Sequence, residues 1–123
     1  MTIRRVVGAL ALVAFVPLAA AAADVTGTWK ASFETQIGQQ NYTFELTVKG
    51  TTLTGRAKSD NGDVEITEGK VDGNTVTFVE NLNFQDMPLR ITYKGTMTSA
   101  DEIAFTRNVA DLAMEELVAK RVK

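Results

Sequence analysis

The sequence contains no cysteine and no histidine, and it has one tryptophan and two tyrosines among 123 residues. Without cysteine the chain cannot form disulfides or offer a thiol nucleophile, and without histidine it lacks the usual zinc ligands and the base of a Ser-His pair. The acidic residues between positions 60 and 68 do not have the spacing of a calcium-binding loop. We therefore predict a protein that is not an enzyme and that holds no metal or cofactor. A hydrolase based on two carboxylates is the remaining enzymatic alternative.

The first 23 residues differ in composition from the rest of the chain. Arg4 and Arg5 precede an apolar stretch over 6–19, and small residues follow as far as Ala23. This order is typical of a secretory signal peptide, with cleavage after Ala22 or Ala23. The apolar stretch is short for a transmembrane span, so no stable membrane insertion is expected after cleavage. The sequence thus predicts a signal peptide over 1–23, a single domain over 24–123, and a periplasmic or secreted location.

The net charge of the domain that follows the predicted signal peptide is small. Residues 24–123 carry 11 basic and 15 acidic side chains, a net charge of −4. The charges are scattered along the chain rather than gathered in runs. A mildly acidic domain of this kind is not expected to bind nucleic acid.

Apolar and polar residues alternate with a period of two through most of residues 24–123, which is typical of strands with one buried face. The phase slips in the fourth alternating segment, which predicts a bulge near Glu68 and Gly69. We expect the stretch from Asn108 to Glu116 to be a loop or a single helical turn. The alternating segments are 25–33, 42–48, 53–57, 64–71, 76–84, 89–97, 103–107 and 117–122.

Short turns join these eight segments, including Asn61-Gly62 and Gly73-Asn74. Tight turns between successive strands predict an antiparallel up-and-down meander. Because every strand has one apolar face, the sheet is expected to close around that face and lose its exposed edges. The fold class is therefore all-β, an eight-stranded antiparallel barrel whose interior is either filled by side chains or holds one small ligand.

The domain begins with a G-x-W motif in Gly27-Thr28-Trp29-Lys30, and it ends with Arg121 in Ala119-Lys120-Arg121-Val122. These features resemble the first-strand signature and the late basic residue of the calycins, which comprise the lipocalins, fatty-acid-binding proteins and avidins. The resemblance implies that Gly27, Trp29 and Arg121 close one end of the barrel. The whole domain also resembles a group of small, uncharacterised exported bacterial proteins. Avidin-type sites use several tryptophans, so the single Trp29 does not suggest biotin binding.

Two charged residues occupy inward positions of the alternation. Arg107 follows Ile103 and Phe105, and Glu80 follows Val76 and Phe78. A buried guanidinium needs a carboxylate, carbonyl groups or an anionic ligand. Either Arg107 and Glu80 pair with each other or lie at the barrel ends, or Arg107 holds a negative group of a ligand with help from Tyr42 and Tyr93. Direct pairing with Glu80 would weaken the second interpretation.

The inward aromatic residues Trp29, Phe44, Phe78 and Phe105 allow two interpretations in the same way. They could line an apolar pocket. In a barrel of this size they could equally form the packed core. Gly95, which is also inward, leaves space for a ligand or for neighbouring rings.

These observations lead to two functional hypotheses. The first is an exported, non-catalytic binding protein for a small apolar or amphipathic molecule held in the barrel, with a negative group of the ligand against Arg107. Its predicted ligand-binding residues are Trp29, Tyr42, Phe44, Phe78, Glu80, Tyr93, Phe105 and Arg107. The alternative is a packed barrel that acts through its surface as a protein-interaction module or protease inhibitor in the cell envelope, with Leu82, Phe84 and Met87 as the place to look for an exposed apolar patch.

Overall fold

The computed structural model describes residues 24–123, so the predicted signal peptide lies outside the described residues. Within them no helix is long and apolar enough to span a membrane. The strands are β1 (Gly27–Thr35), β2 (Gly38–Lys49), β3 (Thr52–Ser59), β4 (Gly62–Glu65), β5 (Thr67–Asp72), β6 (Thr75–Phe84), β7 (Met87–Ser99), β8 (Glu102–Val109) and β9 (Ala113–Arg121).

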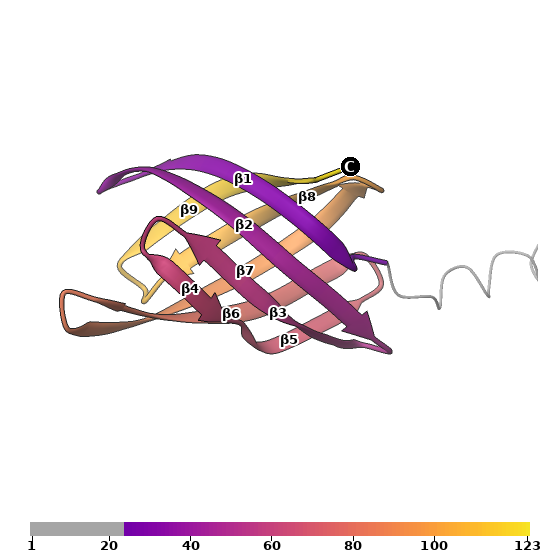
Figure 1. Ribbon diagram of the computed structural model, residues 1–123, viewed down its shortest axis with the longest axis horizontal. Coiled ribbons are helices and arrows are strands. Elements are labelled where there is room, and N and C mark those ends of the chain that lie inside the picture. The colour runs from indigo at the N-terminus through magenta and orange to yellow at the C-terminus, as the bar shows by residue number, and fades with distance from the viewer. Residues whose placement is uncertain (1–23) are drawn as a thin grey trace, which may run out of the picture.

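These strands form one closed antiparallel sheet in which β1 pairs with both β2 and β9 (Figure 1). β4 and β5 are the two halves of the fourth strand, separated at Ile66, and both pair with β3. The predicted all-β, eight-stranded up-and-down barrel is therefore confirmed. The predicted bulge is confirmed as well, because the register between β5 and β6 shifts between Thr67 and Lys70 and Glu68 has a positive φ of 55°.

The expectation of a loop or helical turn over Asn108–Glu116 is wrong. β8 continues to Val109 and β9 begins at Ala113, so only residues 110–112 form the turn. Asn108 stabilises this turn through its side chain. Its Oδ1 accepts a hydrogen bond from the backbone N–H of Asp111 at 2.8 Å, and Ala110 and Asp111 both have positive φ. A tight turn of this kind keeps β8 and β9 paired to their ends.

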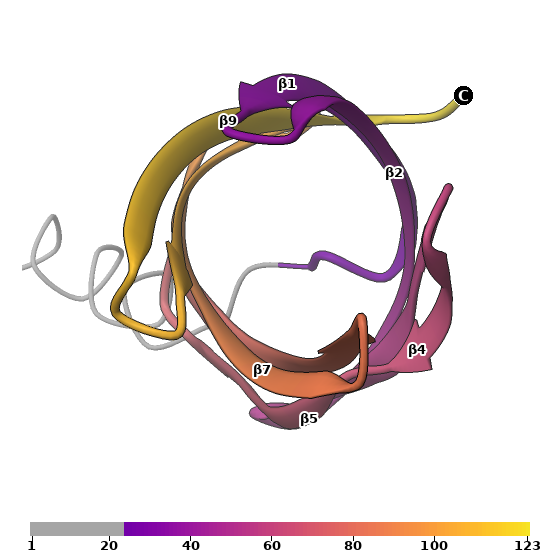
Figure 2. The ribbon, with the colours of Figure 1, turned by 90° about the vertical axis from the view of Figure 1, so that its left-hand side faces the viewer.

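The two ends of the barrel differ, and Figure 2 shows the ring of strands from one of them. We call that end the mouth. It carries the hairpin turns at 36–37, 60–61, 85–86 and 110–112. We call the opposite end the closed end. It carries the turns at 50–51, 73–74 and 100–101, together with the start of β1 and the end of β9. In Figure 2 the segment that precedes β1 crosses the ring at the closed end.

The inward faces of the strands form a single apolar core. Alternate residues of β1, from Trp29 through Ala31 to Phe33, are at most 7% exposed, and the residues between them are exposed. The same alternation repeats along β2 and β8. The buried polar or charged residues among 24–123 are Gln40, Glu80 and Arg107. They mark where the core departs from a purely apolar one.

Candidate functional site

The closed end is sealed by Trp29, which has no exposed surface. Its indole Nε1 donates a hydrogen bond to the carbonyl of Val25 at 2.9 Å, and Val25 is fully buried too. The guanidinium of Arg121 lies 4.4 Å from the centre of the Trp29 ring, an arrangement that a cation–π attraction stabilises. Gly27 leaves room for this guanidinium, because a Cβ there would lie 2.9 Å from Arg121 Nη1, and the φ of +144° favours glycine. The structure thus brings together the three residues that the calycin resemblance assigned to barrel closure.

Arg121 is held mainly by backbone carbonyls. Its Nη1 donates to Thr26 O at 2.8 Å, and its Nη2 donates to Asp24 O at 2.9 Å and to Ala100 O at 3.0 Å. Asp101 adds a carboxylate oxygen 3.3 Å from Nε. The segment before β1, the turn between β7 and β8 and the end of β9 are therefore tied together at one point.

Aromatic rings fill the middle of the barrel. Phe44, Phe78, Tyr93 and Phe105 contact one another in every pairing, with ring centroids between 4.5 Å (Phe78–Tyr93) and 6.2 Å (Phe44–Phe105) apart. The space at Gly95 is taken by the Phe105 ring, whose Cδ1 would lie 2.5 Å from an added Cβ. The structure therefore places Phe44, Phe78 and Phe105 in contact with each other as a packed core, and it places Trp29 at the closed end.

Towards the mouth, a polar cluster interrupts this core. Tyr42 Oη donates to Glu80 Oε2 at 2.8 Å and accepts a hydrogen bond from Arg107 Nη2 at 3.1 Å. Tyr93 Oη makes the same bridge on the other side, donating to Glu80 Oε1 at 2.8 Å and accepting from Arg107 Nε at 2.8 Å. Arg107 Nη2 also lies 3.8 Å from Glu80 Oε1. The two predicted charged residues are thus paired, directly and through both tyrosines, which weakens the hypothesis that Arg107 holds a negative group of a ligand.

A further carboxylate belongs to this cluster. Arg107 Nη1 donates to Glu115 Oε1 at 2.5 Å, from the position directly opposite on β9. The Glu115 side chain is 11% exposed. Among the described residues no hydrogen bond reaches its other oxygen, Oε2. The cluster therefore contains two carboxylates and one guanidinium, and it retains an acceptor oxygen without a protein donor.

The environment keeps both phenols protonated over a wide pH range. Burial and the neighbouring Glu80 carboxylate raise the pKa of Tyr42 to about 12, and they raise the pKa of Tyr93 well above its ordinary value. For Arg107, burial lowers the pKa, but the two tyrosines and Glu115 outweigh burial and raise it above its ordinary value. At neutral pH the tyrosines act as neutral bridges between fixed charges.

A pocket with a volume of about 150 Å³ lies at the mouth, directly above the cluster. Arg107 and Glu115 form its charged part, and Gln40 and Asn61, which hydrogen-bond to each other at 3.1 Å, form a neutral polar part. All four mouth hairpins contribute apolar side chains or turn residues to it. The remaining lining residues are Thr35, Gln36, Ile37, Leu82, Phe84, Leu89, Ile91, Val109, Leu112 and Ala113. We call this the mouth pocket.

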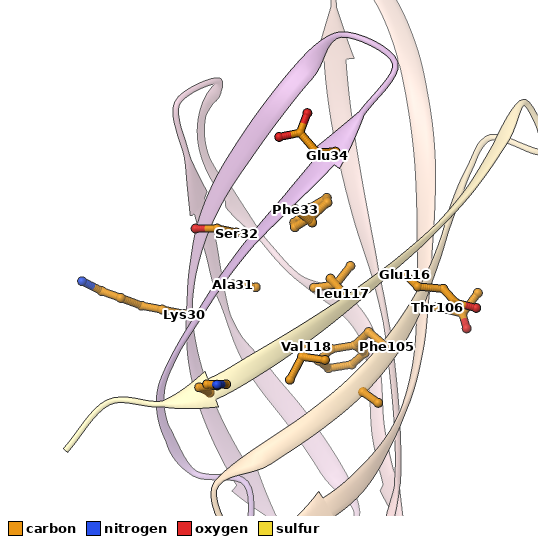
Figure 3. Close-up of a pocket in the computed structure, with 12 residues that line it drawn as sticks. Lys30, Ala31, Ser32, Phe33, Glu34, Phe105, Thr106, Glu116, Leu117 and Val118 are labelled. Carbon is orange, nitrogen blue, oxygen red and sulfur yellow. The ribbon is translucent and has the colours of Figure 1, made fainter.

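A larger hollow, about 840 Å³, lies on the outside of the barrel between β1 and β9. The two strands pair only at Trp29–Arg121 and Lys30–Lys120. Figure 3 shows them diverging from Lys30 towards Glu34, with Phe33 and Leu117 between them. The inward residues that form the floor of this hollow are each at most 7% exposed. The exposed charged side chains of Lys30, Glu34, Glu116 and Lys120 also line it. Because the mouth pocket is the more predominantly apolar of the two and has a few buried polar groups, we regard it as the better candidate site.

The predicted ligand-binding residues fall into three groups. Arg107 alone among the eight lines the mouth pocket. Tyr42, Glu80 and Tyr93 lie beneath it in the polar cluster, and the other four belong to the core or the closed end. Glu115 was not among the predicted residues, and of the apolar residues that line the mouth pocket, Leu82 and Phe84 were predicted only as part of a surface patch. Glu115 could have been found, because it shares the inward phase of Leu117 and Ala119.

Comparison with known proteins supports the architecture. No protein-family model matches the sequence, and no curated protein matches it. Among solved structures, the redesigned β-barrel mFAP1 bound to DFHBI is similar with a TM-score of 0.55 and 13% identity, over 80% of this chain and 94% of that chain. EF1p2_mFAP2b bound to DFHBI has a TM-score of 0.55 and 12% identity, over 80% and 94% of the two chains. A de novo designed fluorescence-activating β-barrel has a TM-score of 0.55 and 19% identity, over 79% and 93%. At these identities the likeness establishes the fold, and the site has to be argued from this chain's own residues.

Proposed function

We propose that the protein is a non-catalytic binding protein for a small apolar or amphipathic molecule that sits in the mouth pocket. The observation that carries this proposal is the combination of an apolar pocket at one barrel end with a buried polar cluster as its floor. Pockets of this composition bind by apolar contact and orient the ligand through a few polar groups.

The size of the pocket limits the part of the ligand that is bound. A cavity of roughly 150 Å³ in another protein accommodates benzene, and the mouth pocket has about the same volume. One ring or a short branched alkyl group fits, and the rest of a larger molecule would extend into solvent. Ile37 and Leu112 are 61% and 73% exposed at the rim, so a bound molecule would cover apolar surface that is otherwise in water.

Two further observations support the proposal. The designed barrels mFAP1 and EF1p2_mFAP2b are bound to DFHBI, so a barrel of this fold can hold a small molecule. The resemblance of Gly27–Lys30 and Arg121 to the calycins points to the same class of function. A signal peptide over 1–23 would place this binding activity in the periplasm or outside the cell.

Benzyl alcohol, a neutral single-ring probe, tests the proposal directly. In a titration followed by amide NMR shifts we expect saturable changes at Ile37, Leu89 and Leu112. Ala113→Phe places a ring inside the mouth pocket and should weaken binding by about tenfold or more. Met114→Phe is the matched control, since Met114 is the next residue on β9, is 66% exposed and does not line the mouth pocket.

Shifts that do not saturate, or that are equally affected by Ala113→Phe and Met114→Phe, would rule out the mouth pocket as the site. If benzyl alcohol does bind in the mouth pocket, native mass spectrometry of protein purified without denaturation is the next measurement, because it can identify the natural ligand. A reproducible small-molecule adduct that is absent from the Ala113→Phe variant is the expected result.

One observation favours a second function, docking of the mouth against another protein such as an envelope component or a protease. Met87 is 57% exposed at the tip of the β6–β7 hairpin, and it stands at the same end as the exposed Ile37 and Leu112. Such a group of exposed apolar residues is typical of an interaction surface. In this case Met87→Ser would weaken partner binding and Ala113→Phe would leave it intact, the reverse of the pattern expected for a pocket ligand.

A further inference from the structure

We infer that the mouth pocket selects ligands that carry a positive charge, such as an amine attached to a ring or a short alkyl group. This inference rests on the proposed function and names the chemical class of the ligand. It replaces the expectation of a negative ligand group, which rested on the position of Arg107 alone.

The charges beneath the pocket are unequal. Glu80 and Glu115 contribute two formal negative charges, and Arg107 contributes one positive charge. An anionic ligand would raise the local excess of negative charge, whereas a cation would neutralise it. In a poorly solvated site an unbalanced charge is costly, so the charge balance favours the cation.

The hydrogen bonds of the cluster favour a donor as well. Three of the five N–H groups of Arg107 donate to a tyrosine or to Glu115, and Nη2 also lies 3.8 Å from Glu80 Oε1, so the charge of Arg107 is directed at groups of the protein. Glu115, in contrast, lines the pocket with Oε2 open to a donor. A protonated amine offers N–H donors to this oxygen, and a charge-assisted hydrogen bond of this type is among the strongest that a protein makes.

The rim of the mouth is acidic. Three of the four mouth turns contain an aspartate, namely Asp60, Asp86 and Asp111, and none of the four contains lysine or arginine. Apart from Arg107, the basic residues nearest to these turns in the sequence are Lys58 and Arg90. Both are engaged on the outside of the barrel, Lys58 with Glu45 at 3.1 Å and Arg90 with Glu68 at 2.6 Å. The rim thus attracts cations towards the pocket.

Three probes with the same ring and different charge test the inference at pH 7: benzylamine, benzyl alcohol and benzoate. We expect benzylamine to bind about tenfold more tightly than benzyl alcohol, and benzoate about tenfold more weakly. Added salt should reduce the advantage of benzylamine. Equal binding of the three probes, or tighter binding of benzoate, would overturn the inference.

A matched pair of variants separates the pocket from the net charge of the protein. Glu115→Gln and Glu116→Gln remove the same charge from adjacent residues, but Glu115 lines the mouth pocket and Glu116 is exposed on the outer face. We expect Glu115→Gln to abolish the difference between benzylamine and benzyl alcohol and Glu116→Gln to preserve it. Equal effects of the two variants would contradict a role for the pocket.

The double variant Asp60→Asn, Asp86→Asn covers the case in which Glu115→Gln does not fold, because both aspartates lie in exposed turns. It should reduce the preference for benzylamine by about twofold. An unchanged preference would contradict the statement that the aspartates of the rim attract cations. The outcomes also separate the two proposals. Benzyl alcohol binding that Ala113→Phe removes, with no preference for benzylamine, would reject only the charge inference, whereas absence of benzyl alcohol binding at the mouth would reject the proposed function itself.

Discussion

Arg121 and Arg107 occupy opposite ends of the barrel, and the protein holds them in opposite ways. Arg121 donates to three backbone carbonyls in two separate segments and covers the ring of Trp29. Among the described residues Arg107 donates only to side chains, namely two phenols and a carboxylate, and it lines a pocket. Carbonyl partners are fixed by the backbone, whereas side-chain partners can be exchanged for a ligand. One arginine therefore fixes the closed end through the backbone, and the other belongs to a side-chain network next to a pocket.

The chain also carries a separate optical reporter for each end. Its single tryptophan, Trp29, lies at the closed end, and its two tyrosines, Tyr42 and Tyr93, both belong to the polar cluster near the mouth. Tryptophan fluorescence and tyrosinate absorbance therefore follow the two ends independently. A change confined to one end can be measured while the other end stays intact.

Replacing Arg107 by leucine should have the largest effect. Glu80, which is 1% exposed, would lose its positive partner, and breaking a buried pair by removing one member costs about 3–5 kcal/mol of the free energy of unfolding. Urea denaturation measures this loss. The double variant Arg107→Leu, Glu80→Leu should recover part of it, because neither partner is then left unpaired. A single variant as stable as the parent protein would contradict the description of the cluster as a closed network.

The second largest effect is expected from alkaline pH, which should lower the free energy of unfolding through the tyrosines of the polar cluster. Below pH 10 both phenols are protonated in the folded and the unfolded chain, so their contribution to stability is fully present. Between pH 10 and about 12 the unfolded chain loses the Tyr42 proton while the folded chain keeps it, because burial and Glu80 raise the pKa of Tyr42 to about 12. The free energy of unfolding should therefore fall by about 3 kcal/mol for Tyr42 over this range.

Tyrosinate absorbance and Trp29 fluorescence measured on the same sample test this prediction. We expect tyrosinate to form only as the protein unfolds. Tyr42→Phe should make the loss of stability with pH less steep. Tyrosinate formation near pH 10 while the fluorescence of Trp29 is unchanged would show that the phenols are not held in the cluster.

Replacing Arg121 by leucine should have the smallest effect of the three. Its side chain is 22% exposed, so water can replace part of what the carbonyls lose, and we expect a loss of about 1–2 kcal/mol. The fluorescence of Trp29 should shift to longer wavelength while the alkaline tyrosinate transition keeps its shape. Lys120→Leu is the control, since that side chain is 70% exposed and should change stability by less than about 0.5 kcal/mol. If Arg121→Leu and Lys120→Leu lowered the free energy of unfolding equally, Arg121 would contribute no more to barrel closure than an ordinary surface residue.

The alternation of residues predicted the fold because it reports which face of each strand is buried. It placed Trp29 and Phe105 inward, and it identified Glu80 and Arg107 as buried charges, which the structure shows. The segment 108–116 was misjudged because its residues also fit a helical face, and this interpretation hid the inward phase that Glu115 shares with Leu117 opposite Arg107.

The site could be predicted only in part. Tyr42, Glu80, Tyr93 and Arg107 come from β2, β6, β7 and β8, and inward phase does not show which residues of separate strands meet. That depends on the tilt and stagger of the strands around the ring. The pocket is lined by residues of four hairpins that are distant in sequence, and a period-two pattern does not show where these hairpins lie relative to one another. The sequence therefore indicates candidate residues and leaves their grouping to the structure.

The incomplete pairing of β1 with β9 has a consequence for how the chain folds. Every other neighbouring pair of strands joins segments close in sequence, so hairpins can form early with little loss of loop entropy. The ring closes only when the first and last strands meet, at Trp29–Arg121 and Lys30–Lys120. We therefore expect these contacts to form after the transition state, so that changes in them alter the unfolding rate far more than the folding rate. Arg121 would then determine the lifetime of the folded barrel, because it slows unfolding, and it would have little influence on the folding rate.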